Sequence, residues 1–106
     1  MVNSRLIETA GEKVLRGLVL EMLSQAEPAG ATPELIQAAL KPYAHLLTKD
    51  AVLKICGYLK GKGLATFEHF SNDRLNISRL IVNITPKGID VLEGTETIDG
   101  IELVGG

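Results

Sequence analysis

TKDAVLKICGYLKGKG, residues 48–63, is the stretch that decides the fold, and it reads as one capped helix leading into an extended segment. Thr48 is a suitable N-cap because its hydroxyl can accept from a free backbone N–H of the first turn, and Gly63 can adopt the left-handed conformation that ends a helix. An apolar face is predicted at helical spacing, comprising Val52, Ile55, Cys56 and Leu59. The opposite face holds Asp50, Lys54, Gly57 and Gly61. One side should pack against a core, while the other suits either a phosphate backbone or plain solvent.

A long helix is expected upstream, over about Ser4–Gln25. Its apolar residues recur at helical period and form one broad stripe: Leu6, Ile7, Ala10, Val14, Leu15, Leu18, Val19, Met22 and Leu23. Gly11 weakens the pattern and could mark a break between a short arm and the helix proper. In either version, this segment is predicted to be scaffold.

A second, short helix follows the turn at residues 27–31. Thr32 is its expected N-cap, Pro33 its first helical residue, and Pro42 its terminator, since proline disfavours helical geometry in the residue before it. The predicted buried face consists of Leu35, Ile36, Ala39 and Leu40. About seven residues then lead to Thr48, and two such helices with a polar cap on the second are typical of a helix-turn-helix.

After Gly63 the apolar period changes from about 3.6 to about 2, which predicts a β-hairpin. We expect strands at residues 64–70 and 80–84, with turn chemistry at residues 71–74. The apolar positions move from odd numbers (Leu75, Ile77) to even numbers (Leu80, Val82, Ile84). A bulge or a loosely ordered loop is therefore predicted near Ser78 and Arg79, with a mobile hairpin tip.

The remaining chain contains one more helix signal and an acidic end. TPKGIDVLEG, residues 85–94, has a threonine cap, a proline at the first helical position and a closing glycine, which predict a fourth, short helix. Residues 95–106 are acidic and partly alternating, so Ile98, Ile101, Leu103 and Val104 could form an edge strand, contact another subunit or belong to a frayed tail. We expect one domain over residues 1–94 followed by an acidic tail over residues 95–106.

Composition limits the class of protein. A chain of 106 residues with 45% hydrophobic content can build one core, and its single cysteine excludes an intrachain disulfide. With only four aromatic residues, it is poorly supplied for stacking single-stranded bases. Acidic residues within the first 21 positions oppose a signal peptide, and no apolar run approaches the ~18 residues of a membrane span, so we expect a cytoplasmic protein without membrane contact.

Charge is unevenly distributed along the chain, although the formal net charge is only −2. Residues 1–40 contain three cations and five acids, residues 41–89 contain eight cations and three acids, and residues 90–106 contain five acids and no cation. The positive block coincides with the helix at residues 48–63 and the hairpin. A DNA-binding face would leave this pattern, and a merely solvated surface would leave it equally well.

Catalytic chemistry is not expected. His45 and His69 lie near no CxxC, HExxH or paired-carboxylate arrangement, and the glycines around Lys62 follow a helix, whereas a phosphate-binding loop precedes one. The sequence therefore predicts no catalytic residue, no cofactor and no metal ligand.

The order of elements resembles winged helix-turn-helix domains. KDAVLKICGYLKGKGLATFE (residues 49–68) and ITPKGIDVLEG (residues 84–94) carry the resemblance, through the glycine–leucine pair after the helix and the TPKG after the hairpin. More narrowly, the chain is similar to small uncharacterised winged-helix proteins of Mu-like phages and prophages. The positions that match are Thr85, Gly88, Asp90, Glu93 and Gly94, with Ile98, Gly100 and Ile101 in the tail. The resemblance implies an α+β winged helix-turn-helix fold with a three-helix core, a phage or prophage context and, by analogy, DNA binding.

The leading functional hypothesis is a small regulatory or accessory protein that binds double-stranded DNA. The candidate DNA-binding residues are Lys41, Lys49, Lys54, Tyr58, Lys60, Lys62, Arg74 and Arg79. Lysines would neutralise phosphates, and Lys49 and Lys54 are the candidate base readers among them. A homodimer through the first helix or the tail would double the contacts. The alternative is a protein-interaction module on the same scaffold, in which the tail or the hairpin docks a phage or host partner.

Overall fold

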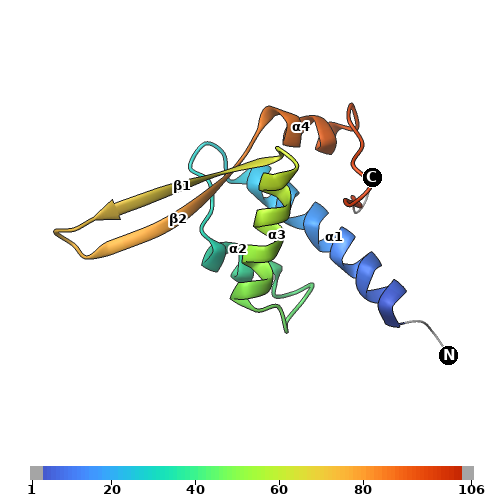
Figure 1. Ribbon diagram of the computed structural model, residues 1–106, viewed down its shortest axis with the longest axis horizontal. Helices are drawn as coiled ribbons and strands as arrows, with labels where there is room; N and C mark the ends of the chain where they lie inside the picture. The colour runs from blue at the N-terminus through green and yellow to red at the C-terminus, as the bar shows by residue number, and fades with distance from the viewer. Residues whose placement is uncertain (1–3, 104–106) are drawn as a thin grey trace.

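The computed structural model describes the backbone of residues 4–103 and the side chains of residues 11–103. The elements are α1 (Ser4–Gln25), α2 (Pro33–Leu40), α3 (Lys49–Gly61), β1 (Ala65–Asn72), β2 (Ile77–Ile84) and α4 (Pro86–Glu93) (Figure 1). This part of the chain is therefore α+β, with four helices and one two-stranded antiparallel sheet. The predicted order of elements is confirmed, and α1 runs through Gly11 without the break that the sequence left open.

The core lies where α1, α2 and α3 meet the base of the hairpin. The fully or nearly fully buried side chains include Val19, Leu20 and Leu23 of α1, Ile36 and Leu40 of α2, Val52, Ile55, Cys56 and Leu59 of α3, and Leu64, Ala65, Val82 and Ile84 around the hairpin. The predicted buried face of α3 is confirmed at all four positions. Leu20 joins this core although it lies outside the predicted stripe, while Leu6, Ile7 and Ala10 of that stripe lie outside the described side chains.

The predicted buried face of α2 is wrong at two positions. Leu35 and Ala39 are exposed, and Pro33 is buried in their place beside Ile36 and Leu40. The helix has only eight residues, and it contacts the core along one narrow stripe that consists of Pro33, Ile36 and Leu40. A side chain one position away from this stripe faces solvent even when it is apolar.

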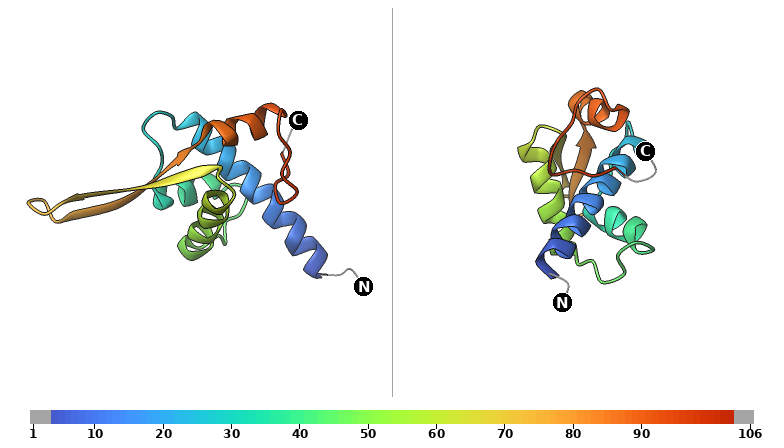
Figure 2. Two further views of the ribbon diagram at one scale, coloured as in Figure 1. Left: turned by 45° about the horizontal axis from the view of Figure 1, so that its top comes forward. Right: turned by 90° about the vertical axis from the view of Figure 1, so that its right-hand side faces the viewer.

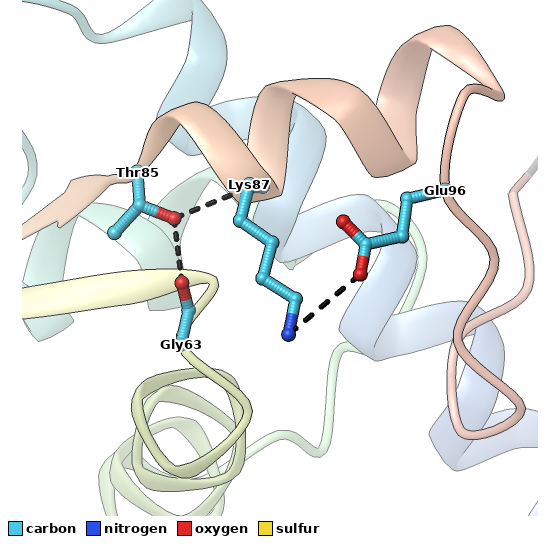
Figure 3. A network of polar contacts seen from close by, with 5 residues as sticks. Gly63, Thr85, Lys87 and Glu96 are labelled. Atoms are coloured by element: carbon cyan, nitrogen blue, oxygen red, sulfur yellow. Dashed lines mark hydrogen bonds and ion pairs between the residues drawn. The ribbon is translucent and has the colours of Figure 1, made fainter.

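Thr85 connects the end of α3 to the start of α4, and the two hydrogen bonds of its hydroxyl group are drawn in Figure 3. Its hydroxyl donates to the Gly63 carbonyl oxygen at 2.7 Å and accepts from the Gly88 backbone N–H at 3.1 Å, while its own N–H donates to the Leu64 carbonyl oxygen at 3.0 Å. Gly88 permits this approach, because a Cβ there would lie 2.6 Å from both Ile84 Cγ1 and the Leu64 carbonyl oxygen. The junction sets the direction in which the hairpin leaves α3.

The hairpin is longer and more regular than the sequence predicts. Its strands pair without interruption from Ala65 opposite Ile84 to Asn72 opposite Ile77. The predicted bulge near Ser78 and Arg79 is therefore wrong. The apparent slip in alternation arises because Ile77 points to the opposite face of β2 from Leu80, Val82 and Ile84, in a part of the strand that no core covers.

A further backbone pairing holds the hairpin base. Ala31, in the turn between α1 and α2, exchanges two hydrogen bonds with Val82, with N···O distances of 2.9 and 2.8 Å. The sequence predicts only a turn at residue 31. This bridge attaches β2 to the helical part of the chain near its inner end and leaves the outer half of the hairpin projecting away from the helices (Figures 1 and 2).

The described part of the tail turns back over the helices, which the second view in Figure 2 shows. The Glu102 N–H donates to the Lys13 carbonyl oxygen at 3.1 Å, and Ile98 and Ile101 pack against the core. Residues 95–103 contain no strand, so the edge-strand alternative does not apply to them, and Val104 lies outside the described residues. Among the described helices, none has the length and apolar character needed to cross a bilayer.

Candidate nucleic-acid interface

Local signals in the sequence position α3. The Thr48 hydroxyl accepts from the Ala51 backbone N–H at 3.1 Å, and Thr48 itself has extended backbone angles of φ −88° and ψ 162°, as an N-cap requires. At the other end, Gly63 has φ +75°, and the Leu64 N–H donates to the Leu59 carbonyl oxygen at 2.8 Å. The capped helix packs through its four apolar residues and turns its lysines outward.

The outward face of α3 is not covered by the described part of the chain. An ideal Cβ at Gly57 or at Gly61 would meet no atom within 4 Å. Asp50 and Lys54 are exposed on the same side of the helix. The helix backbone is therefore open to close approach along about one turn, from Gly57 to Gly61.

The lysines of α3 differ in what they contact. Lys49 lies 3.5 Å from a carboxylate oxygen of Glu34 on α2, and the Lys60 ammonium lies 4.8 Å from the centre of the Phe67 ring on β1. Lys62 lies 5.6 Å from the centre of the Tyr58 ring. Among described side chains, Lys54, Lys60 and Lys62 have no carboxylate within 4.0 Å, so their charges are available to an external anion.

Tyr58 has a structural role that the sequence does not predict. The Arg16 guanidinium of α1 stacks over its ring at 3.9 Å, and Gly100 of the tail lies against its hydroxyl group. Arg16 also donates to the Gly100 carbonyl oxygen at 3.1 Å and lies 3.6 Å from Glu12. Tyr58 is half-buried in this contact between α1, α3 and the tail. No sequence signal pairs these residues, because they are far apart in the chain.

The two arginines of the hairpin lie near its outer end. Arg74 is in the turn, and Arg79 on β2 faces Phe70 across the ladder. Both are exposed, and no described carboxylate lies within 4.0 Å of either. Lys41, at the start of the loop between α2 and α3, is exposed as well. The candidate DNA-binding residues therefore lie on three parts of the structure, namely α3 and its C-terminal end, the loop after α2, and the projecting hairpin.

A pocket of about 350 Å³ lies between α1 and α3 beside this face. Leu15, Leu47, Ala51 and Ile55 supply its apolar lining, while Glu12, Arg16, Lys54 and Tyr58 supply its polar groups. The sequence does not predict this pocket, since the pocket depends on how two separate helices cross. Lys54 borders both the pocket and the outward face of α3.

The remaining reactive side chains form no cluster among the described residues. Burial in the core raises the pKa of the Cys56 thiol to about 11, which leaves it protonated and unreactive at neutral pH. His45 and His69 are exposed. No group of three or more His, Cys, Asp or Glu residues in the described part of the chain is placed to hold a metal ion.

No protein-family model matches the chain, and no curated protein matches it either.

Proposed function

We propose that the chain is a small winged-helix protein that binds double-stranded DNA. The succession of α1, α2 and α3 followed by a hairpin is compatible with this layout, in which the helix corresponding to α3 enters the major groove. The observation that carries the proposal is the outward face of α3, where Gly57 and Gly61 leave the backbone uncovered and the ammonium groups of Lys54 and Lys60 have no described carboxylate partner.

The roles of the candidate residues follow from their contacts. Lys60, Lys62 and Lys41 would neutralise phosphates and so position the protein without reading sequence. Lys54 and Lys49 would reach base edges, and Lys49 would first exchange its contact with Glu34. An exposed ion pair of this kind contributes only about 0–1 kcal/mol, so breaking it to bind DNA costs little free energy.

Arg74, Arg79 and Tyr58 complete the proposed set. The hairpin arginines would contact the DNA backbone on one side of α3. Tyr58 would support the face from its position under Arg16. A homodimer through α1 or the tail would double these contacts, and a regulatory or accessory role in a phage or prophage is the context that the resemblance in sequence implies.

Charge removal tests the proposal. Lys60→Gln and Lys62→Gln each delete one of the proposed phosphate contacts, and Lys87→Gln deletes a cation from α4, where it lies 3.7 Å from Glu96. Fluorescence anisotropy with a labelled 20-base-pair duplex, titrated at several salt concentrations, gives the affinity and its salt dependence. We expect the first two variants to reduce the slope of log affinity against log salt by about 0.9 each, and the third to leave it unchanged. Equal slopes in all three variants would overturn the proposed face.

A protein-interaction module is the second candidate, and one observation favours it. Three large apolar side chains on α2 and the following loop are strongly exposed: Leu35 at 51%, Tyr43 at 68% and Leu46 at 83%. These three residues lie within twelve positions of one another, and a contiguous exposed apolar patch is typical of protein contacts. If the chain shows no DNA binding even at low salt, this surface becomes the place to search, and Leu46→Ser should then abolish partner capture.

A further inference from the structure

The outer end of the hairpin presents an apolar side chain to solvent. Leu75, in the turn between β1 and β2, is 66% exposed, and Phe70 nearby on β1 is 50% exposed. Buried side chains are confined to the base of the hairpin, at Ala65, Val82 and Ile84. Figures 1 and 2 show the outer half projecting away from every helix, so within the described structure Leu75 has no core to pack against.

The turn holds Leu75 in a defined position. The Leu75 backbone N–H donates to the side-chain oxygen of Asn72 at 3.2 Å, and the Asn76 N–H donates to the Asp73 carbonyl oxygen at 3.3 Å. Asn76 adopts the left-handed conformation, with φ +53°, which asparagine tolerates better than most residues. The last strand pair, Asn72 opposite Ile77, directly supports this turn. The apex is therefore a paired, hydrogen-bonded end that carries an exposed leucine.

Two exposed arginines lie close to this leucine along the hairpin. Arg74 is adjacent to it in the turn, and Arg79 lies two residues into β2, opposite Phe70. Asp73 is the single acid of the turn. An apolar tip accompanied by two cations is complementary to stacked bases that are bordered by phosphates.

We propose that Leu75 inserts as a wedge between two base pairs from the minor groove of duplex DNA, with Arg74 and Arg79 on the flanking phosphates. This inference rests on the proposed DNA binding and adds a mechanism to it. Proteins that bend DNA use leucine, phenylalanine and similar side chains in this way, and the unstacking is offset by the protein surface that the bent duplex then contacts. The wedge makes the protein a DNA-bending factor that prefers flexible pyrimidine–purine steps such as TA.

The test measures bending and base unstacking on the same duplex. The full-length protein is titrated into a 30-base-pair duplex with a central TA step. One preparation of the duplex carries a dye at each end, so that energy transfer reports bending. A second preparation carries 2-aminopurine at the TA step, so that its emission reports unstacking. We expect energy transfer and 2-aminopurine emission both to rise with the wild-type protein. Leu75→Ser should abolish both increases while anisotropy still reports binding, and Leu75→Met should retain them.

Leu103→Ser is the matched control, because it makes the same change at an exposed leucine of the tail, away from the hairpin. It should retain both increases. Binding without a rise in either signal would overturn the wedge and leave the proposed DNA binding intact, whereas absence of binding at low salt would overturn both. If Leu75→Ser leaves the DNA signals unchanged and converts a dimer to a monomer in sedimentation, the apex contacts a second copy of the chain, and the wedge is refuted.

Discussion

Replacing Gly57 with alanine should stabilise the protein, because the outward face of α3 leaves room for the added methyl group. Gly57 lies inside α3, and a Cβ there meets no atom within 4 Å, so the substitution has no steric cost in the described structure. Glycine inside a helix costs roughly 0.5–1 kcal/mol relative to alanine, through the larger entropy of the unfolded chain. We therefore expect the free energy of unfolding to rise by about 0.5–1 kcal/mol and the Tm by roughly 2–6 °C.

Gly88 supplies a control of opposite sign. It also lies in a helix, so helix propensity alone predicts the same gain, but a Cβ there would lie 2.6 Å from the Leu64 carbonyl oxygen and from Ile84 Cγ1. Gly88→Ala should therefore destabilise the protein. Urea unfolding followed by far-UV circular dichroism measures both variants, with equal m-values expected. A Gly57→Ala variant no more stable than the wild type would refute the reasoning, because something would then cover the face that the structure shows open.

Three further outcomes are expected. Thr48→Ala should lower the free energy of unfolding by about 1 kcal/mol through loss of the helix cap, and Thr48→Ser should restore most of it, as urea unfolding will show. Arg16→Ala should release the tail from Tyr58, which limited proteolysis will detect as faster cleavage after residue 94, with unchanged cleavage refuting the contact. Burial raises the pKa of Cys56 in the folded state above its unfolded value of about 9, because the folded state favours the protonated thiol. The stabilisation that comes from the protonated thiol is therefore complete below pH 9 and is lost as the pH rises toward 11. The fall in stability between these values should be smaller in Cys56→Ala, and equal pH profiles would contradict this assignment.

The helix boundaries were predictable because their signals are local. The hydroxyl groups of Thr32, Thr48 and Thr85 each accept from the backbone N–H three residues ahead. These helix caps can be recognised from the local sequence without knowledge of the rest of the fold. The buried face of α3 was predictable for the same reason, since all four residues follow helical spacing within one element. The exposure of α3's lysines follows from that face and was predictable with it.

The errors occurred where more than one element was involved. The buried face of α2 was wrong at Leu35, because periodicity says which residues share a side but not how wide the contact with the core is. The bulge expected at Ser78 was wrong, because alternation reports a strand only where one of its faces is buried, and the outer half of the hairpin has no buried face.

The sequence by itself determined the order of helices and strands, the caps and the inward face of α3, all of which depend on residues a few positions apart. Only the tertiary structure decided that the hairpin projects with Leu75 at its apex, that Arg16 and the tail enclose Tyr58, and that α1 and α3 form a pocket beside Lys54. These features depend on contacts between residues up to 84 positions apart, as for Arg16 and Gly100. Local spacing carries no information about such pairs, because they are selected by the way whole elements pack.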